Sequence, residues 1–410
     1  MDPDRRQAPV GSRAAAALAT LLERTHLAPP DALPDAVGAA LDRLGATGTL
    51  YLADYAGTTL VPMTRPGADR PPNLALDTTV AGLAFRTTSA TPGPSGDAPV
   101  LWMPVIDGVE RLGVLKIELR RAADLRDDAF RHDCWLVVHL LGHLVSVMDA
   151  FGDGIDTARR DAPRTVAAEL IWQLLPPLTA GTDKVVVTGR LEPSGAVGGD
   201  AFDYALSDDT AQFTILDATG HDVRSGLAAS TALAACRNAR RQGHGLFAQT
   251  EAIHRAVTDE FAGGMFVTGV LGHLDLRSGR LRYLAAGHPP PLLLRRGRVV
   301  KRLTSGKRPL LGLEMQHATV AEEPLAPDDV VVLYTDGVIE ARDHEHQMFG
   351  TDRLVDFLER EAADGTPLPE VVRRVCRRIL DHQGGELQDD ATVLLVQWTS
   401  RGQALLDPLR

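Results

Sequence analysis

The feature that most constrains this chain is a pair of aspartates, Asp200 and Asp217, in the segment 197–221. Asp200 follows two glycines, where the backbone can turn sharply because glycine has no Cβ. Residues 207–210 predict a hairpin turn and residues 213–216 a strand, so Asp217 stands at a strand end before a glycine-containing turn. This geometry would aim both carboxylates at one point. Acids in such positions are either ordinary turn residues or ligands of a hard metal ion, and this segment alone leaves both interpretations open.

Two further acidic positions repeat the arrangement later in the chain. Asp336 closely follows the apolar run 330–334, and Asp389 and Asp390 precede the apolar run 391–398. Carboxylates that converge on one spot repel each other unless a cation is bound between them. Oxygen-only ligation favours Mg²⁺ or Mn²⁺ over zinc. Two such ions about 3.5 to 4 Å apart would hold a bridging water and lower its pKa from about 15.7 toward roughly 7. The four strand-end acids therefore indicate a bound hard cation.

The composition indicates a globular protein of more than one domain and argues against several functions. A chain of 410 residues exceeds the roughly 150 residues of an ordinary domain. Its 54 acidic and 43 basic residues give a net charge of −11, which disfavours a nucleic-acid or anionic-membrane partner. The longest apolar run, 134–148, is shorter than the roughly 20 residues that a membrane-spanning helix needs. Residues 1–10 are polar and do not resemble a secretion signal.

The cysteines indicate the compartment. Cys134, Cys236 and Cys376 lie far apart in sequence and include no C-x-x-C spacing. Neither a disulfide framework nor a zinc knuckle is supported by this pattern. A reducing cytoplasm is the simplest expected location.

The first third of the chain predicts a small α/β module. Apolar residues at helical spacing indicate helices at 14–23 and 33–44. Segments 64–72 and 87–99 are rich in proline, glycine and small polar residues and are expected to be loops. Extended apolar patterns predict strands at 48–53, 100–105 and 112–119, with a hairpin turn at 107–108.

Part of this module resembles a known family. The segments T-V-A-G-L-A-F-R-T at 79–87 and P-V-L-W-M-P-V-I-D-G-V-E-R-L-G-V-L-K-I-E at 99–118 resemble the second half of a GAF domain, over roughly residues 30–150. The resemblance implies a regulatory module that binds a small molecule or chromophore, or that serves only for dimerisation, and it leaves the ligand open. No cysteine lies in 55–99, which argues against a thioether-linked chromophore there.

A long helix is expected at 127–150, followed by a linker at 151–164 and a second helix at 163–175. His139 and His143 are spaced to bind a metal, but no third ligand lies nearby in sequence, so packing or interface roles are favoured. The helical periodicity also predicts one apolar face, which favours a homodimer and consists of Leu136, Leu140, Leu144, Val147 and Met148.

The remainder of the chain predicts an α+β layered sandwich, because its strands come in one run and its helices in blocks. The expected strands are 185–191, 213–216, 269–276, 280–285, 291–294, 330–334 and 391–398, and the expected helices are 225–241, 247–261, 351–361 and 368–382.

Eight motifs in this region resemble, in order and spacing, the SpoIIE-type phosphatases, the bacterial branch of the metal-dependent PPM serine/threonine phosphatases. They cover residues 163–398 and read A-A-E-L-I-W-Q-L-L-P at 167–176, V-G-G-D-A-F-D at 197–203, L-D-A-T-G-H at 216–221, M-F-V-T-G-V-L-G at 265–272, Y-L-A-A-G-H-P-P-P at 283–291, L-Y-T-D-G-V-I-E-A at 333–341, M-F-G at 348–350 and D-D-A-T at 389–392. The resemblance implies a PPM-type α-β-β-α sandwich that hydrolyses phosphoesters with two Mn²⁺ or Mg²⁺ ions and needs no covalent nucleophile.

The resemblance also implies roles for individual residues. Asp217 would bridge both metals, and the backbone carbonyl of Ala218 would be a further ligand. Asp336 and Asp389 would complete one metal site, and Asp200 would bind the other metal directly or through its waters. Two other acids have less defined roles: Asp390 would orient its neighbour, and Asp203 would support the loop fold.

Two histidines and two departures from the family pattern leave alternatives open. His221 and His288 are either general acids or structural hydrogen-bonding residues, and because each follows a glycine in a turn the structural role is favoured. Asp222 stands where most relatives have glycine, and it would add an acid near the metals. Gly195 stands where the eukaryotic enzymes have a phosphate-binding arginine. Arg190 is the nearest candidate, but an exposed strand-end arginine is the favoured interpretation, so phosphate recognition is expected to rest on the metals.

Taken together, the sequence predicts a cytoplasmic, GAF-regulated phosphoserine/phosphothreonine protein phosphatase. Its expected segments are an N-terminal extension with a short helix (1–29), a GAF-like sensor domain (30–150), a linker (151–164), a SpoIIE-type phosphatase domain (165–400) and a tail (401–410). The family resemblance implies a phosphorylated anti-anti-sigma factor of the STAS type as substrate. The signal at the sensor, a small molecule or a protein, is left open, and so is whether the phosphatase is silent without it. The alternative is a catalytically inactive scaffold of the same fold, which would have no need for converging acids.

Overall fold

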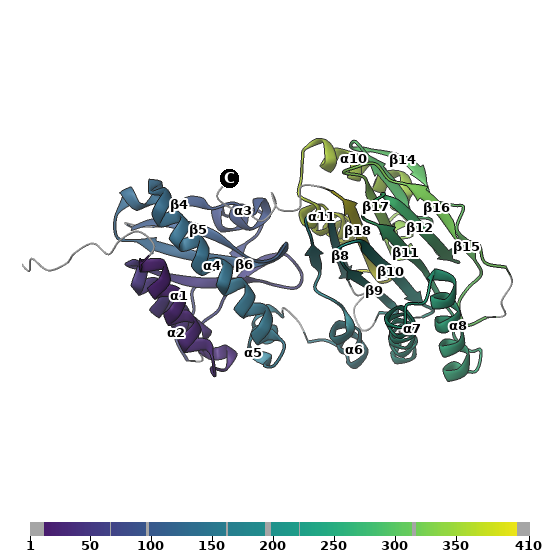
Figure 1. The fold of residues 1–410 in the computed structure, drawn as a ribbon, viewed down its shortest axis with the longest axis horizontal. Helices are drawn as coiled ribbons and strands as arrows, with labels where there is room; N and C mark the ends of the chain where they lie inside the picture. The colour runs from purple at the N-terminus through teal and green to yellow at the C-terminus, as the bar shows by residue number, and fades with distance from the viewer. Residues whose placement is uncertain are drawn as a thin grey trace, which may run out of the picture. The chain divides into compact units, whose positions relative to one another are not determined.

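The computed structural model describes residues 12–65, 67–95, 98–160, 163–192, 198–220, 222–313 and 317–399. The chain forms two compact units that divide between Pro163 and Arg164 (Figure 1). His221 and the predicted tail at 401–410 lie outside the described residues. Among the described residues no single helix is long and apolar enough to cross a membrane. Helices α4 (Asp128–Asp149) and α5 (Asp153–Arg159) pass that test only as a pair, bent by 104° at the break between them.

The N-terminal unit contains a six-stranded antiparallel sheet in the order β3-β2-β1-β6-β5-β4. The strands are β1 (Ala46–Ala53), β2 (Thr59–Pro62), β3 (Leu74–Ala75), β4 (Thr91–Ser95), β5 (Ala98–Asp107) and β6 (Glu110–Leu119). The predicted strands at 48–53, 100–105 and 112–119 are confirmed and lengthened. The prediction of a loop at 87–99 is wrong for β4, which pairs with β5 as the outermost strand of the sheet. Its prolines are tolerated there because an edge strand has one row of unpaired backbone groups.

Helices cover both faces of this sheet. The helices of the unit are α1 (Ser12–Thr25), η1 (Pro30–Ala32), α2 (Leu33–Leu44), α3 (Val80–Thr87), η2 (Ala122–Arg126), α4 and α5. Apolar residues of α1, α2 and α4 form one core with β1, β5 and β6, and α3 packs against Tyr51 and Trp102 in a second core. Because Ala17 and Leu21 of α1 are fully buried in the first core, this helix belongs to the unit and is not a separate extension.

Helix α4 shows a different buried face from the predicted one. Its core-facing residues include Cys134, Val138, Leu141 and Met148, all at most 2% exposed. Leu136, Leu140 and Leu144 are half-buried and Val147 is exposed, so Met148 lies on the core face and not with these four.

The two histidines of α4 that are spaced to bind a metal are exposed. His143 Nδ1 lies 2.9 Å from Asp107 Oδ1, and the His139 ring stacks on Trp135 with 5.3 Å between centroids. In the described part of the chain neither histidine belongs to a group of three or more His, Cys, Asp or Glu side chains arranged to hold a metal ion, so the pair gains no support as a metal site.

The segment 151–164 is not a plain linker, because it contains α5. Ile155 is fully buried, and Arg159 is 7% exposed. Arg159 Nε donates to Ala53 O at 3.0 Å, and its guanidinium lies 4.4 Å from the centroid of the Tyr55 ring. These contacts are long-range in sequence, so a local pattern of small and polar residues did not predict them.

The C-terminal unit contains two six-stranded sheets. The first has the order β15-β12-β11-β10-β9, with β16 paired to β12, and consists of β9 (Asp200–Leu206), β10 (Thr210–Ala218), β11 (Val267–Asp275), β12 (Arg280–Ala286), β15 (Lys307–Arg308) and β16 (Ala321–Pro324). The second has the order β14-β13-β17-β18-β8-β7 and consists of β7 (Thr179–Gly181), β8 (Val185–Glu192), β13 (Leu292–Arg295), β14 (Arg298–Arg302), β17 (Val330–Tyr334) and β18 (Ala391–Trp398).

Helices cover the outer faces of both sheets (Figure 1). The helices are α6 (Val166–Leu174), α7 (Val223–Arg241), α8 (Leu246–Phe261), α9 (Asp336–Ile339), α10 (Gly350–Ala363) and α11 (Leu368–His382). Apolar residues of α7 and α8 share a core with β10 and β11, and those of α10 and α11 share a core with β17 and β18. The predicted α-β-β-α sandwich is confirmed.

Strand β17 illustrates why this sequence forms a central strand. All five of its residues are buried. Val331 and Leu333 belong to the core between the sheets, whereas Val332 and Tyr334 belong to the core under α10 and α11. Alternate residues of a strand point to opposite faces, so an uninterrupted apolar run fits a strand that is covered on both sides.

Candidate metal centre

Two of the predicted acids lie opposite each other on neighbouring strands. The ladder between β9 and β10 pairs Asp200 with Asp217, and the ladder between β10 and β11 pairs Asp217 with Thr268. Directly opposed residues of an antiparallel pair share one face, with Cβ atoms about 4.5 to 5.5 Å apart. Asp200 is 2% exposed and Asp217 is half-buried. The sheet register therefore brings the two carboxylates together.

The second sheet contributes the remaining acids. Asp336 begins α9 directly after β17, and Asp389 and Asp390 immediately precede β18. Burial, followed by the like charges of Asp336, Asp389 and Asp390, raises the pKa of Asp217 to about 8. Burial, Asp217 and Asp390 likewise raise the pKa of Asp200 well above its usual value. The acids of the two sheets are therefore close enough to repel one another.

Two threonines, which the sequence reasoning missed, connect Asp200 to the second sheet. Thr335 Oγ1 and Thr392 Oγ1 donate to Asp200 Oδ2 at 2.8 and 2.6 Å. The backbone N–H of Thr392 in turn donates to Thr335 Oγ1 at 3.0 Å. Both threonines are fully buried. Their only signal in the sequence is their position beside the strand-end acids, which local propensity does not distinguish from ordinary strand threonines.

Glycines permit the close approach of the backbone at this site. A Cβ on Gly199 would lie 2.2 Å from the carbonyl oxygen of Ala218, and a Cβ on Gly198 would lie 2.2 Å from Asp390 Oδ2. A Cβ on Gly337 would lie 1.9 Å from the backbone oxygen of Asp390. A larger residue at any of these three positions would displace the Ala218 carbonyl, the Asp390 carboxylate or the Asp390 backbone carbonyl.

The donor set fits a hard divalent cation. The acid cluster is the set of carboxylates that the two sheets bring together: Asp200, Asp217, Asp336, Asp389 and Asp390. With the Ala218 carbonyl it offers only oxygen atoms, the ligands that Mg²⁺ and Mn²⁺ prefer. The mutual repulsion that raises the pKa values of Asp200 and Asp217 is the electrostatic condition that a cation relieves. No three of the described His, Cys, Asp or Glu side chains already stand in a metal-binding arrangement.

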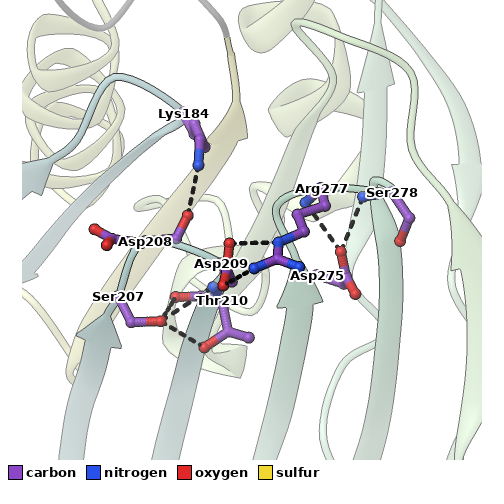
Figure 2. A network of polar contacts seen from close by, with 8 residues as sticks. All are labelled: Lys184, Ser207, Asp208, Asp209, Thr210, Asp275, Arg277 and Ser278. Carbon is purple, nitrogen blue, oxygen red and sulfur yellow. Dashed lines mark hydrogen bonds and ion pairs between the residues drawn. The ribbon is translucent and has the colours of Figure 1, made fainter.

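Ordinary turn acids of the same sheet behave differently. Figure 2 shows the polar turn at the opposite end of the β9–β10 hairpin, where Arg277 Nε donates to Asp209 Oδ1 at 2.6 Å. Asp275 Oδ1 accepts from the backbone N–H groups of Arg277 and Ser278, both at 2.9 Å. The Arg277 hydrogen bond lowers the pKa of Asp209, and the Ser278 backbone lowers that of Asp275. Partnered turn acids thus have lowered pKa values, whereas the pKa values of Asp200, Asp217 and Asp336 are raised.

Two other acids singled out in the sequence have structural partners. Asp203 is 2% exposed and binds Arg237 and Arg240 of α7, each at 2.7 Å, so it ties the helix to β9. Asp222 is the N-cap of α7 and accepts from the Ser225 backbone N–H at 3.0 Å. That hydrogen bond lowers the pKa of Asp222 and accounts for an acid at this position without a metal.

Arg190 is not the exposed strand-end arginine that the sequence favoured. It lies on β8 in an ion pair with Glu192, with its side chain only 11% exposed. Its electrostatic neighbours include Cys376 and Arg373 of α11, so it belongs to the contact between β8 and that helix.

His288 contacts the acid cluster indirectly. His288 is 8% exposed, and its Nδ1 lies 2.7 Å from Thr268 Oγ1. Burial lowers the pKa of His288 to about 3. The imidazole is therefore neutral at neutral pH and is not a general acid there.

Comparisons with known proteins find relatives of the C-terminal unit. Residues 207–399 match the family model of Stage II sporulation protein E (SpoIIE). Protein IcfG of Synechocystis sp. is 31% identical over 135 residues, which cover 32% of this chain and 20% of IcfG. Phosphoserine phosphatase RsbU of Bacillus subtilis is 20% identical over 270 residues, which cover 64% of this chain and 80% of RsbU.

Solved structures are similar to the same part of the chain. The SiaA-PP2C domain of Pseudomonas aeruginosa is 25% identical with a TM-score of 0.49, over 57% of this chain and 94% of that domain. RsbX, solved in complex with magnesium, is 12% identical with a TM-score of 0.42, over 54% of this chain and 98% of RsbX. On the strength of the family match, the C-terminal unit of this chain is a SpoIIE-family domain, homologous to the PPM serine/threonine phosphatases.

Proposed function

We propose that this protein is a metal-dependent protein phosphatase that hydrolyses phosphoserine or phosphothreonine on a regulatory protein. The observation that carries the proposal is the convergence of Asp200, Asp217, Asp336 and Asp389 from two sheets of a SpoIIE-family domain. RsbU, to which this chain is similar, is named a phosphoserine phosphatase, and this supports the same class of reaction here.

The residues that would hold the cations are the acids of the cluster. Asp217 would contact both ions, Asp336 and Asp389 would complete one site, and Asp200 and the Ala218 carbonyl would serve the other ligand positions. Two Mn²⁺ or Mg²⁺ ions would supply a nucleophilic water of lowered pKa and neutralise the phosphoryl oxygens. The chain itself orients these acids: Thr335 and Thr392 hold Asp200, and the glycines keep the Ala218 carbonyl accessible.

A cysteine-dependent mechanism is not supported. Such chemistry needs an accessible thiolate of low pKa. Cys134, Cys236 and Cys376 are all buried, and burial raises the pKa of each thiol, to about 12 for Cys236 and Cys376.

The proposed substrate is a phosphorylated anti-anti-sigma factor of the STAS type, and the proposed location is the cytoplasm. The likeness to RsbU and to the SpoIIE family supports this substrate class. The net charge of −11 fits a protein partner better than nucleic acid or an anionic membrane.

The proposed regulator is the N-terminal unit, as a GAF-like sensor. A cavity of about 530 Å³ in this unit supports a small-molecule signal, and its lining includes Val61 of β2, Met63 just after that strand, and Thr157 of α5. Helix α5 is the last described helix before the boundary at Pro163. A small molecule bound beside it would therefore act on the segment that leads out of the N-terminal unit. The half-buried leucines of α4 and exposed Val147 support a homodimer through that face.

The alternative is an inactive scaffold of the same fold. One observation favours it: no three of the described His, Cys, Asp or Glu side chains already stand in a metal-binding arrangement. Release of phosphate from a phosphorylated anti-anti-sigma protein and from p-nitrophenyl phosphate, with and without Mn²⁺, separates the two. We expect Mn²⁺-dependent release that is lost in Asp217→Asn and kept in Asp209→Asn, the turn acid of Figure 2. No release by the unmodified protein with either substrate would refute the enzyme and leave the scaffold.

A further inference from the structure

His288 is a buried imidazole that the proposed hydrolysis does not use. Its Nε2 is buried and has no hydrogen-bond partner in the part of the chain that the structure describes. Leaving a buried polar atom without a partner costs about 1 to 3 kcal/mol. An apolar side chain would fill the same space without that cost. The imidazole therefore has a role that depends on its other nitrogen, Nδ1, which contacts Thr268.

The backbone brings the ring to Thr268. Strand β12 ends at Ala286, which pairs with Gly269 of β11. Gly287 then adopts φ +61°, a left-handed conformation that glycine enters without strain. The next side chain, His288, consequently lies beside Thr268, the neighbour of Gly269 on β11.

Thr268 connects His288 to the central acid of the cluster. Its hydroxyl oxygen lies 2.7 Å from His288 Nδ1 and 3.5 Å from Asp217 Oδ2. A threonine hydroxyl donates one hydrogen and accepts through two lone pairs. When Nδ1 carries the proton of the neutral ring, it donates to Oγ1, and the hydroxyl hydrogen is directed to Asp217. This tautomer also spares the chain a buried N–H at Nε2 without an acceptor.

We propose that His288 is a positioning residue that acts through Thr268, directing its hydroxyl to Asp217 and holding this carboxylate in the orientation that binds a divalent cation. The inference rests on the proposed function, because it concerns the same metal centre. Hydrogen-bond partners behind metal ligands fix the ligands' orientation, and their loss weakens metal binding 10- to 100-fold. A neutral ring performs this role without adding a positive charge that would repel the cation.

The test measures Mn²⁺ affinity of the full-length, metal-free protein by titration calorimetry, a readout independent of hydrolysis. Thr268→Val and His288→Leu are each expected to weaken Mn²⁺ binding about 10-fold or more. The double variant should be no weaker than the weaker single variant, because both changes interrupt one path. His288→Asn, which keeps a polar group near the position of Nδ1, should recover part of the loss. His273→Asn is the matched control, since His273 lies farther along β11 opposite Gln212 and should leave Mn²⁺ affinity unchanged.

The proposal is overturned if the losses of Mn²⁺ affinity in the two single variants add in the double variant. It is also overturned if both single variants bind Mn²⁺ within twofold of the unmodified protein. If His288→Leu does not fold, judged by circular dichroism, Thr268→Val and His288→Asn carry the test by the same twofold criterion. Hydrolysis of p-nitrophenyl phosphate is measured in parallel. If the two substitutions weaken Mn²⁺ binding without adding and the protein hydrolyses nothing, the proposed function is refuted and the positioning role is supported. If the protein hydrolyses the substrate but the two losses add or are absent, the positioning role alone is refuted. A protein that binds no Mn²⁺ refutes both.

Discussion

Replacing Asp217 with asparagine is expected to stabilise the metal-free protein at pH 8 while abolishing its activity. The folded state raises the pKa of Asp217 from 3.8 to about 8, because burial and the neighbouring acids disfavour the charged form. Between these two values the folded state holds a proton that the unfolded state has released, so stability falls as the pH rises. The penalty is fully present above pH 8 and absent below about pH 4.

The size of the effect follows from the pKa shift. A shift of about four units corresponds to about 6 kcal/mol. Because Asp217 is only half-buried by its exposed area, solvent screening reduces this, and we take on the order of 3 kcal/mol. For a domain of roughly 150 to 250 residues, that difference raises the melting temperature by about 6 to 12 °C.

The assay is calorimetric unfolding in EDTA at pH 5 and pH 8. Asp217→Asn should melt at a higher temperature than the unmodified protein at pH 8, with a smaller gain at pH 5. Asp209→Asn is the control: a hydrogen bond with Arg277 lowers the pKa of this carboxyl, so its loss should not stabilise the protein at either pH. A melting temperature of Asp217→Asn at pH 8 equal to or below that of the unmodified protein would refute the electrostatic account of the cluster.

Three further predictions concern single contacts. Thr392→Val removes a hydrogen bond to buried Asp200 and should cost about 1 to 3 kcal/mol in thermal unfolding, whereas Thr392→Ser should keep most of the stability; equal losses in both variants would contradict the role of the hydroxyl. Asp222→Ala removes the N-cap bond to Ser225 and should cost about 1 kcal/mol without changing Mn²⁺ affinity, so a weakened affinity would instead make Asp222 part of the metal site. Arg159→Met removes the contacts that hold α5, and hydrogen exchange of residues 153–159 should become faster while that of β6 stays unchanged; unaltered exchange of α5 would show that Ile155 alone anchors it.

Much of the architecture is readable from the sequence because it depends on local periodicity. The apolar runs that become β10, β17 and β18 and the amphipathic segments that become α7 and α11 have patterns matched to one kind of element. The misses have a common cause. Strand β4 and helix α5 lie in segments rich in proline, glycine or polar residues and are held by contacts with distant partners, β5 and Ala53. On α4 the periodicity was correct, but which side faces the core depends on the sheet beneath it.

The sequence by itself determined which residues are proposed to carry the chemistry: aspartates at the ends of apolar strands, beside glycines that let the backbone turn. Only the tertiary structure decided how they act together. The register of β9 on β10 sets Asp200 opposite Asp217, and the packing of one sheet on the other brings Thr335, Thr392 and the acids of the second sheet to the same place. Register and sheet packing join residues more than a hundred positions apart, and the energy that selects them comes from burial and hydrogen bonds that no local segment contains.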